Sequence, residues 1–153
     1  MEDGAARQVV VDLPPDRTAP GVARRVLRAL LAPTPVRAAL DAVLVVTTEL
    51  VTNAVRHGAP PVRLTVRVTR DSVSVAVHDL SQRPPARRTA DDDAESGRGL
   101  LLVEQLASES GLQREAQGGK TVWARFSVQL GAAQGDAVPE TAVAPTQAPA
   151  PRR

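Results

Sequence analysis

The sequence predicts an α+β domain, a two-layer α/β sandwich with a mostly antiparallel mixed sheet and helices on one face. Three observations favour this fold class. Segments with an apolar residue at every second position come in pairs joined by short turns, as in antiparallel hairpins. Two segments before residue 58 and one after residue 98 have apolar residues at helical spacing instead. Apolar residues make up 42% of 153 residues, which is enough for one core, and the chain is too short for two.

Composition and charge exclude several functional classes. The chain has no cysteine, which excludes disulfides, thiol nucleophiles and cysteine-based metal sites, and its two histidines cannot alone complete a structural zinc site. The 19 basic and 17 acidic residues nearly balance, and aromatic residues make up 1%, so a nucleic-acid partner is not expected. No apolar run approaches the length of a membrane span and no signal segment is evident, so we expect a cytoplasmic protein without a membrane partner.

The N-terminal part is expected to form one strand and two helices. Alternation over residues 7–13 indicates a short strand, which two prolines end. Helical spacing follows, with Asp16 or Thr18 as the capping residue. A second helix begins at Thr34–Pro35 and ends at Gly58, a strong stop signal because two prolines follow.

Two hairpins, a loop and a helix complete the predicted domain. Residues 62–77 alternate as a hairpin with one buried face and one solvated face. The 19 residues 80–98 have no apolar period, which is typical of a functional loop or lid. A helix over 99–107 and a final hairpin over 111–128 follow.

The chain is therefore expected to hold one folded domain with unstructured ends. We place a disordered N-terminus at 1–6, the domain at 7–130 and a disordered Ala/Pro-rich tail at 131–153. The tail contains no Leu, Ile or Phe, so it cannot bury enough apolar surface to offset the entropy lost on ordering.

Three polar side chains share one edge of the second helix. At about 100° per residue, Glu49, Asn53 and His57 fall within about 80° of each other, on a rim shared with Ala42 and Val46. Asn53 suits a hard oxygen ligand of Mg²⁺, and Glu49 suits a group that orients or deprotonates a nucleophile. The alternatives are a half-solvated helix edge and, for His57, a structural role at the helix end. The predicted core face of this helix consists of Leu40, Val43, Leu44, Leu50, Val51, Ala54 and Val55.

Polar residues also mark the ends of two predicted strands. Asp79 follows the first hairpin, where its carboxylate would accept a hydrogen bond from an exocyclic amine such as that of adenine, or would simply form a turn. Lys120, the only lysine in the chain, and Thr121 open the last strand after two glycines. Thr121 either binds near the Asp79 side of a pocket or is an ordinary β-branched strand residue.

A glycine segment, Ser96–Leu100, precedes the third predicted helix. Gly97 and Gly99 would let the backbone approach a ligand closely, and the helix N-terminus presents unpaired N–H groups to an anion. Arg98 either pairs with a phosphate or is solvated. The segment matches neither the dinucleotide glycine pattern nor the P-loop, and a flexible hinge is the alternative.

Together these motifs resemble those of a known family. They are ELVTNAVRHG at 49–58, Asp79, SGRGL at 96–100 and GGKTVW at 118–123. Over roughly residues 7–130, the chain resembles the ATP-binding fold shared by gyrase-type ATPases and histidine kinases, the Bergerat or histidine kinase-like ATPase fold. More closely, it is similar to the small stand-alone actinobacterial ATP-binding regulators of the type of anti-sigma-factor serine/threonine kinases.

The resemblance implies a role for each motif, with ATP and Mg²⁺ as cofactors. It implies that Glu49 is the catalytic base, Asn53 the magnesium ligand and Asp79 the residue that reads adenine. The residues 97–100 and the pair Lys120–Thr121 would contact the nucleotide, with the two glycines acting as a hinge of the lid. One departure is that the family has glycines after the adenine-reading Asp, whereas this chain continues LSQRPP, which implies a different pocket floor.

Two functions follow from the resemblance. The first is a serine/threonine kinase that passes the γ-phosphoryl group of Mg-ATP to a small antagonist protein; its partners would be a sigma factor, this anti-anti-sigma antagonist, or both. The alternative is a non-catalytic module that binds a sigma factor or similar regulator, with a degenerate or structural nucleotide site. A sensor domain that phosphorylates its own histidine is disfavoured, because no helical hairpin precedes the ATP-binding region. Homodimerisation is left open.

Overall fold

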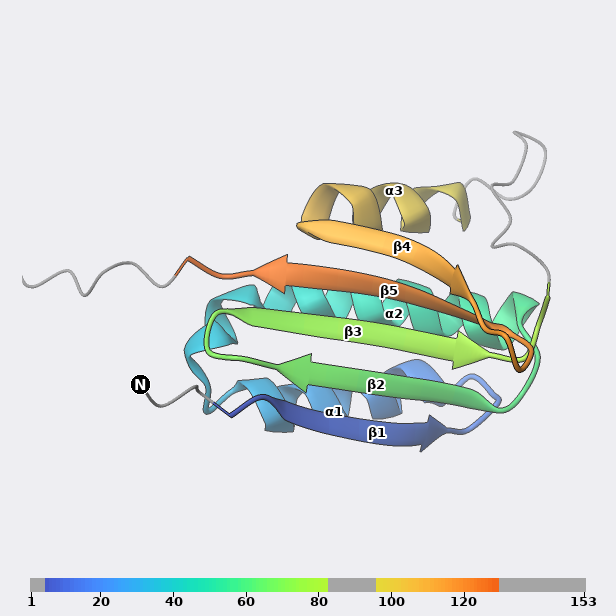
Figure 1. The fold of residues 1–153 in the computed structure, drawn as a ribbon, viewed down its shortest axis with the longest axis horizontal. Helices are drawn as coiled ribbons and strands as arrows, with labels where there is room; N and C mark the ends of the chain where they lie inside the picture. Colours follow the sequence, from blue (N-terminus) through green and yellow to red (C-terminus); the bar gives the residue numbers. More distant parts are fainter. Residues whose placement is uncertain (1–4, 83–95, 130–153) are drawn as a thin grey trace, which may run out of the picture.

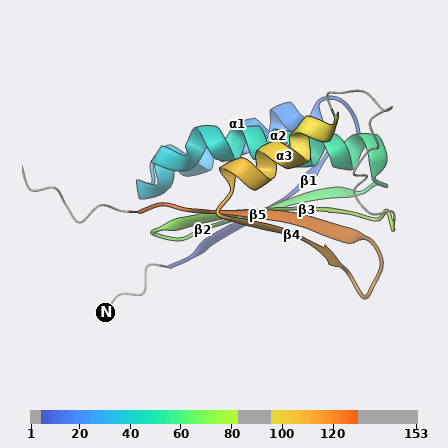
Figure 2. The same cartoon turned by 90° about the horizontal axis from the view of Figure 1, so that it is seen from above.

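The computed structural model describes residues 5–82 and 96–129 of the chain (Figure 1). In this part of the chain, five strands form one sheet and the helices cover one of its two faces (Figure 2). The predicted α+β class is therefore confirmed. The elements are β1 (Arg7–Leu13), α1 (Ala19–Leu31), the 3-10 helix η1 (Pro35–Ala39), α2 (Leu40–His57), β2 (Val62–Val68), β3 (Ser72–Asp79), α3 (Ser96–Leu106), β4 (Glu109–Arg114) and β5 (Lys120–Ser127).

The sheet has the strand order β1-β2-β3-β5-β4. Both predicted hairpins are present, and every strand pair among the described residues is antiparallel, so this part of the sheet is not mixed. The turn between β4 and β5 contains Gly118 and Gly119 at φ of 101° and 88°. Glycine adopts such positive φ values without steric cost, which explains why two glycines stand at this turn.

The two faces of the sheet differ as the alternation predicts. Side chains that point towards the helices are buried, such as Val66, Val75 and Ala124, which lie side by side across β2, β3 and β5. The opposite face carries polar residues and has no helix over it in the described part of the chain (Figure 2). On that face Arg63 forms an ion pair of 2.7 Å with Asp12, and this hydrogen-bonded guanidinium lowers the pKa of Asp12.

The start of the second helix differs from the prediction. The second helix starts with a 3-10 turn, and Thr34 does not cap it: the Thr34 hydroxyl donates to the carbonyl of Leu31 and so closes the end of α1. At the start of α1, the Asp16 carboxylate accepts the Thr18 N–H at 2.8 Å. The predicted end of α2 is confirmed, because the Gly58 N–H donates to the carbonyl of Ala54.

The buried face of α2 is rotated relative to the prediction. Val46, which was placed on the polar rim, is fully buried, whereas Leu40, Leu44 and Val55 are only partly buried. The rim side of α2 faces α3 and β5, because Ala42, one turn before Val46, lines a small groove with Leu106 and Phe126. The buried residues of α2 are Val43, Val46, Thr47, Leu50, Val51 and Ala54.

Segment Pro35–His57 corrects one expectation from the sequence. With a mean hydropathy of 1.5, it is long and apolar enough to cross a membrane, although no run of that length was expected. A single helix of this kind is a weak indication of a membrane span, because the core helix of a soluble protein passes the same test. Six residues of α2 lie in the core of this domain.

Three further expectations lie outside the described residues. They are the disorder of most of the N-terminus, the central part of the loop or lid (83–95), and the disorder of the tail beyond residue 129. The domain limits of 7–130 therefore stay a prediction.

Candidate functional site

Several element ends meet at one end of the sheet. α2 and β3 end there, β5 begins there, and α3 begins at the same end (Figure 1). Antiparallel pairing of β3 with β5 places Asp79 directly opposite Lys120. The turn after α2 reaches the same place, because the Leu80 N–H donates to the carbonyl of Ala59 at 2.8 Å. This end therefore brings together two of the charged residues predicted from the sequence.

Asp79 is a buried carboxylate with two different oxygen environments. Only 1% of the residue is exposed. Its Oδ1 accepts hydrogen bonds from the N–H groups of Ser81 at 2.7 Å and Ala59 at 3.3 Å. Its Oδ2 faces the Lys120 ammonium, whose Nζ lies 3.7 Å away. The bond to Ser81 is that of a turn-forming aspartate, so the structural alternative is realised, and Oδ2 is the oxygen that remains for a further donor.

Lys120 is the buried cation that compensates this charge. Only 5% of the residue is exposed. A buried carboxylate without a counter-charge is strongly destabilising, and a nearby ammonium group reduces that cost. Sequence reasoning singled out Lys120 by its rarity, but the pairing with Asp79 depends on the register between β3 and β5.

Two glycines pack directly against Asp79, which sequence reasoning did not predict. A Cβ atom on Gly58 would lie 2.6 Å from Asp79 Cγ, and one on Gly119 would lie 2.3 Å from the Asp79 carbonyl oxygen. Real Cβ atoms do not approach other atoms this closely, so both positions need glycine for space, and Gly119 needs it for its positive φ as well. The position of each glycine beside a helix end or a turn was visible in the sequence, but not its contact with Asp79.

Glu49 and Asn53 lie one turn apart on α2, and both are partly buried. Among the described residues, no hydrogen bond or ion pair engages either side chain. α2 lies between α1 and α3 in the helical layer (Figure 1). The α1 side of α2 is marked by Thr48, which accepts a hydrogen bond from Arg24 at 3.3 Å. Glu49 and Asn53 therefore occupy the edge of α2 away from α1, as helical spacing predicts.

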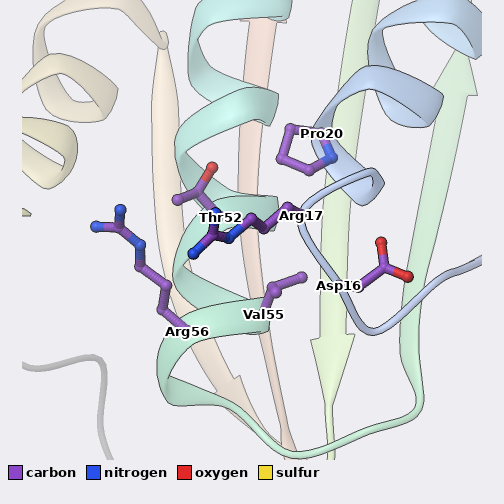
Figure 3. Close-up of a pocket in the computed structure, with 6 residues that line it drawn as sticks. All are labelled: Asp16, Arg17, Pro20, Thr52, Val55 and Arg56. Atoms are coloured by element: carbon purple, nitrogen blue, oxygen red, sulfur yellow. The ribbon is translucent and has the colours of Figure 1, made fainter.

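A groove on the other side of α2 does not contain the predicted site. It has a volume of 710 Å³ and lies between the start of α1 and the C-terminal part of α2. Figure 3 shows Arg17 extending over Thr52 and Val55, while Asp16 points away from them. The Asp16 carboxylate is engaged by Thr18, whose two hydrogen bonds lower the pKa of Asp16. The groove residues are Asp16, Arg17, Pro20, Thr52, Val55 and Arg56.

The glycine segment forms the first turn of α3. The helix begins at Ser96, so Gly97 and Gly99 lie within it and do not precede it. The side chains of residues 96–100, which include Arg98 and Leu100, lie outside the described part of the chain. The first N–H groups of a helix have no partner within that helix, so this turn can present donors to an anion.

The side chain of Thr121 does not share a face of the sheet with Asp79. Thr121 is paired with His78, one position along from the Asp79–Lys120 pair, so both lie on the helix-free face of the sheet. The Thr121 hydroxyl donates to Glu115 at 2.9 Å, which is the role of an ordinary strand residue. His57 is exposed in the last turn of α2, which agrees with a structural role at the helix end.

Comparisons with known proteins agree with this geometry. Residues 13–126 match the model of the histidine kinase-like ATPase domain. No curated protein matches the chain. Among solved structures that match, a crystal structure of the RsbU and RsbW domains of a Mycobacterium tuberculosis protein has 23% sequence identity and a TM-score of 0.60.

That alignment covers 78% of this chain and 32% of the mycobacterial chain, so this protein spans about a third of its neighbour. At this identity, the likeness supports the fold alone. The family match shows more than the fold, because it covers most of the chain. It runs from the end of β1 to β5 and includes α2, Asp79 and Lys120. The chain therefore belongs to the histidine kinase-like ATPase domain family.

Proposed function

We propose that this protein is an ATP-dependent serine/threonine kinase of the anti-sigma-factor type. It passes the γ-phosphoryl group of Mg-ATP to a small antagonist protein, and a sigma factor or that antagonist is its partner. The observation that carries the proposal is the placement of Glu49 and Asn53. They lie one turn apart on the edge of α2 away from α1, and Asp79 lies where the same helix ends. Membership of an ATPase family supports the use of ATP.

The residues present fit a magnesium nucleotide. Asn53 offers an amide oxygen that no described residue engages, and Mg²⁺ prefers one or two oxygen ligands from protein together with phosphates and waters. When bound, Mg²⁺ neutralises charge that develops on the transferred phosphoryl group. The first turn of α3 supplies N–H donors for phosphate oxygens. Oδ2 of Asp79 would accept a hydrogen bond from the exocyclic amine of adenine.

Glu49 is the proposed general base. Its carboxylate lies on the same helix edge as Asn53, one turn further from the Asp79 end. It accepts the proton of the incoming serine or threonine hydroxyl as this oxygen attacks the γ-phosphorus, while the bond from phosphorus to the β,γ-bridging oxygen breaks and ADP leaves. Catalysis of phosphoryl transfer depends mostly on positioning and on charge neutralisation, so a rigid core helix is a suitable support for this group.

The Glu49→Gln variant tests this mechanism. The protein is incubated with γ-labelled Mg-ATP and with antagonist proteins co-purified from its host. We expect Glu49→Gln to bind Mg-ATP as the wild type does and to label the antagonist at least about 100-fold more slowly, because general-base catalysis contributes about that much or more. Asp41→Asn is a matched control, since Asp41 is an exposed carboxylate in the first turn of the same helix. Equal labelling by wild type and Glu49→Gln would exclude the mechanism.

A second candidate function is a binding module without turnover. The burial of Asp79 favours it, because a carboxylate that is 1% exposed and already paired with Lys120 is not open to solvent. The absence of glycines in the sequence after Asp79 favours it as well. Calorimetric titration with Mg-ATP separates the two functions: this candidate requires sigma-factor binding with no heat from the nucleotide.

A further inference from the structure

The buried pair Asp79–Lys120 combines a carboxylate held by backbone N–H groups with a flexible ammonium group. Nζ and Oδ2 are 3.7 Å apart, which is an ion pair but longer than a direct hydrogen bond. The two backbone N–H groups of Ala59 and Ser81 hold Oδ1 and fix the carboxylate plane. Oδ2 is thereby held as an acceptor beside an ammonium donor.

The choice of lysine at this position is informative. The other 18 basic residues of the chain are arginines. An arginine would clamp a carboxylate with its planar fork, whereas a lysine is a point charge with three rotatable donors on a flexible stem. The Lys120 ammonium can therefore stay close to Asp79 and still donate to a second acceptor.

The register places this pair on the side of the sheet where a nucleotide would bind. Asp79 and Lys120 are directly opposed and share the face that the helices cover, whereas the neighbouring pair His78 and Thr121 lies on the other face. α2, the helix that carries Glu49 and Asn53, lies over that same face (Figure 2).

On these grounds, and given the proposed ATP site, we propose that Lys120 is a second base-reading residue. Asp79 Oδ2 accepts a hydrogen bond from the N6 amine of adenine, and Lys120 Nζ donates a hydrogen bond to the adjacent ring nitrogen N1. The pair then recognises a donor, the N6 amine, opposite Asp79 and an acceptor, N1, opposite Lys120. Hypoxanthine and guanine present the reverse, a carbonyl oxygen next to a ring N–H, so Lys120 and Asp79 together select adenine.

Calorimetry with ATP analogues tests this assignment on the full chain. Mg-ATP, Mg-1-deaza-ATP (which lacks N1) and Mg-7-deaza-ATP are titrated into wild type and into Lys120→Met. We expect wild type to bind 1-deaza-ATP about tenfold more weakly than ATP, since a charge-assisted hydrogen bond is lost. It should bind 7-deaza-ATP as it binds ATP. Lys120→Met should bind ATP and 1-deaza-ATP equally, because the donor to N1 is gone.

Arg125→Met is the matched control, because Arg125 is an exposed basic residue on the same strand. This variant should keep the wild-type ratio of the affinities for ATP and 1-deaza-ATP. The comparison of analogues on wild type needs no variant, so it holds even if Lys120→Met unfolds. Equal affinity of wild type for ATP and 1-deaza-ATP overturns the assignment. Tighter ATP binding by Lys120→Met than by wild type also overturns it, because Lys120 would then occupy the space of the adenine base.

The failure of this assignment can be told apart from the failure of the proposed function. If wild type binds no nucleotide, both fail. If wild type prefers ATP to 1-deaza-ATP about tenfold but Glu49→Gln still labels the antagonist, only the kinase mechanism fails.

Discussion

Gly58 packs directly against the Asp79 carboxylate. Its φ of −85° is open to any residue, so its role is not backbone freedom. Its role is space: a Cβ would lie 2.3 Å from the carbonyl oxygen of Ala54 and 2.6 Å from Asp79 Cγ. Both neighbours are fixed, one as helix backbone and the other by two hydrogen bonds.

We expect Gly58→Ala to lower the free energy of unfolding by about 1–3 kcal/mol, because overpacking a fixed site forces backbone shifts. Urea denaturation followed by circular dichroism measures this. Gly21→Ala is the matched control: the nearest atom to its added Cβ is a flexible Arg24 nitrogen at 3.9 Å, so helix propensity should leave stability unchanged or raise it. A Gly58→Ala variant as stable as wild type would show that the turn after α2 relaxes freely.

The sequence indicated which residues belong to the candidate site, but not which residues they contact. Asp79 at a strand end and Lys120 as the only lysine were both visible as exceptions to the surrounding pattern. Their contact was not, because it depends on how two strands far apart in the sequence are aligned. Thr121 shows the same limit, since a shift of one position along a strand moves a side chain to the opposite face.

At the scale of elements, α2 holds two neighbouring threonines in opposite situations. Thr47 is fully buried, and its hydroxyl has no hydrogen-bond partner among the described residues. Thr48 is partly buried, donates to the carbonyl of Leu44 at 2.7 Å and accepts from Arg24. A buried polar group without a partner costs free energy, whereas a satisfied hydroxyl contributes to stability.

We expect Thr47→Val to raise the free energy of unfolding by about 1 kcal/mol, because valine fills nearly the same volume without a hydroxyl. Thr48→Val, its matched neighbour, should lower it by a similar amount. Both are β-branched replacements in one helix, so differences in helix propensity cancel. Thermal or urea unfolding gives the comparison. If Thr47→Val were the less stable of the two, the wild-type Thr47 hydroxyl would have to form a hydrogen bond in solution.

Periodicity predicted where the elements are, but it did not fully predict which sides they bury. Alternation in the strands gave both hairpins, since one face of the sheet is covered and the other is not. For α2 the same reasoning places Val46 on the polar rim. A helical wheel does not show that α2 packs against other elements on two of its sides, α1 on one and α3 and β5 on the other. Contacts with α3 and β5 depend on the order of the strands, which local sequence does not encode.

At the scale of the whole molecule, α2 and β3 end, and α3 and β5 begin, at one end of a single layered domain. The helices pack on one face of the sheet, and the predicted magnesium ligand and the buried acid belong to different layers (Figure 2). A ligand that contacts α2, β3, β5 and the start of α3 would therefore join elements from both layers. Binding to the folded state alone stabilises the entire domain by mass action.

Mg-ATP should accordingly raise the melting temperature of the domain. At 100 times the dissociation constant, binding adds about 2.7 kcal/mol, which corresponds to roughly 10 °C for a domain of this size. In Asn53→Ala, the part of the rise in melting temperature that depends on Mg²⁺ should be lost. The part that ATP alone produces when EDTA removes Mg²⁺ should remain. Thr52→Ala should behave as wild type, because Thr52 lines the groove on the α1 side of the same helix turn. Differential scanning fluorimetry with ATP, with and without Mg²⁺, makes the comparison. Because the two substitutions are adjacent and face different sides of α2, an equal loss in both variants would mean that Mg²⁺ does not bind at the helix edge that carries Glu49.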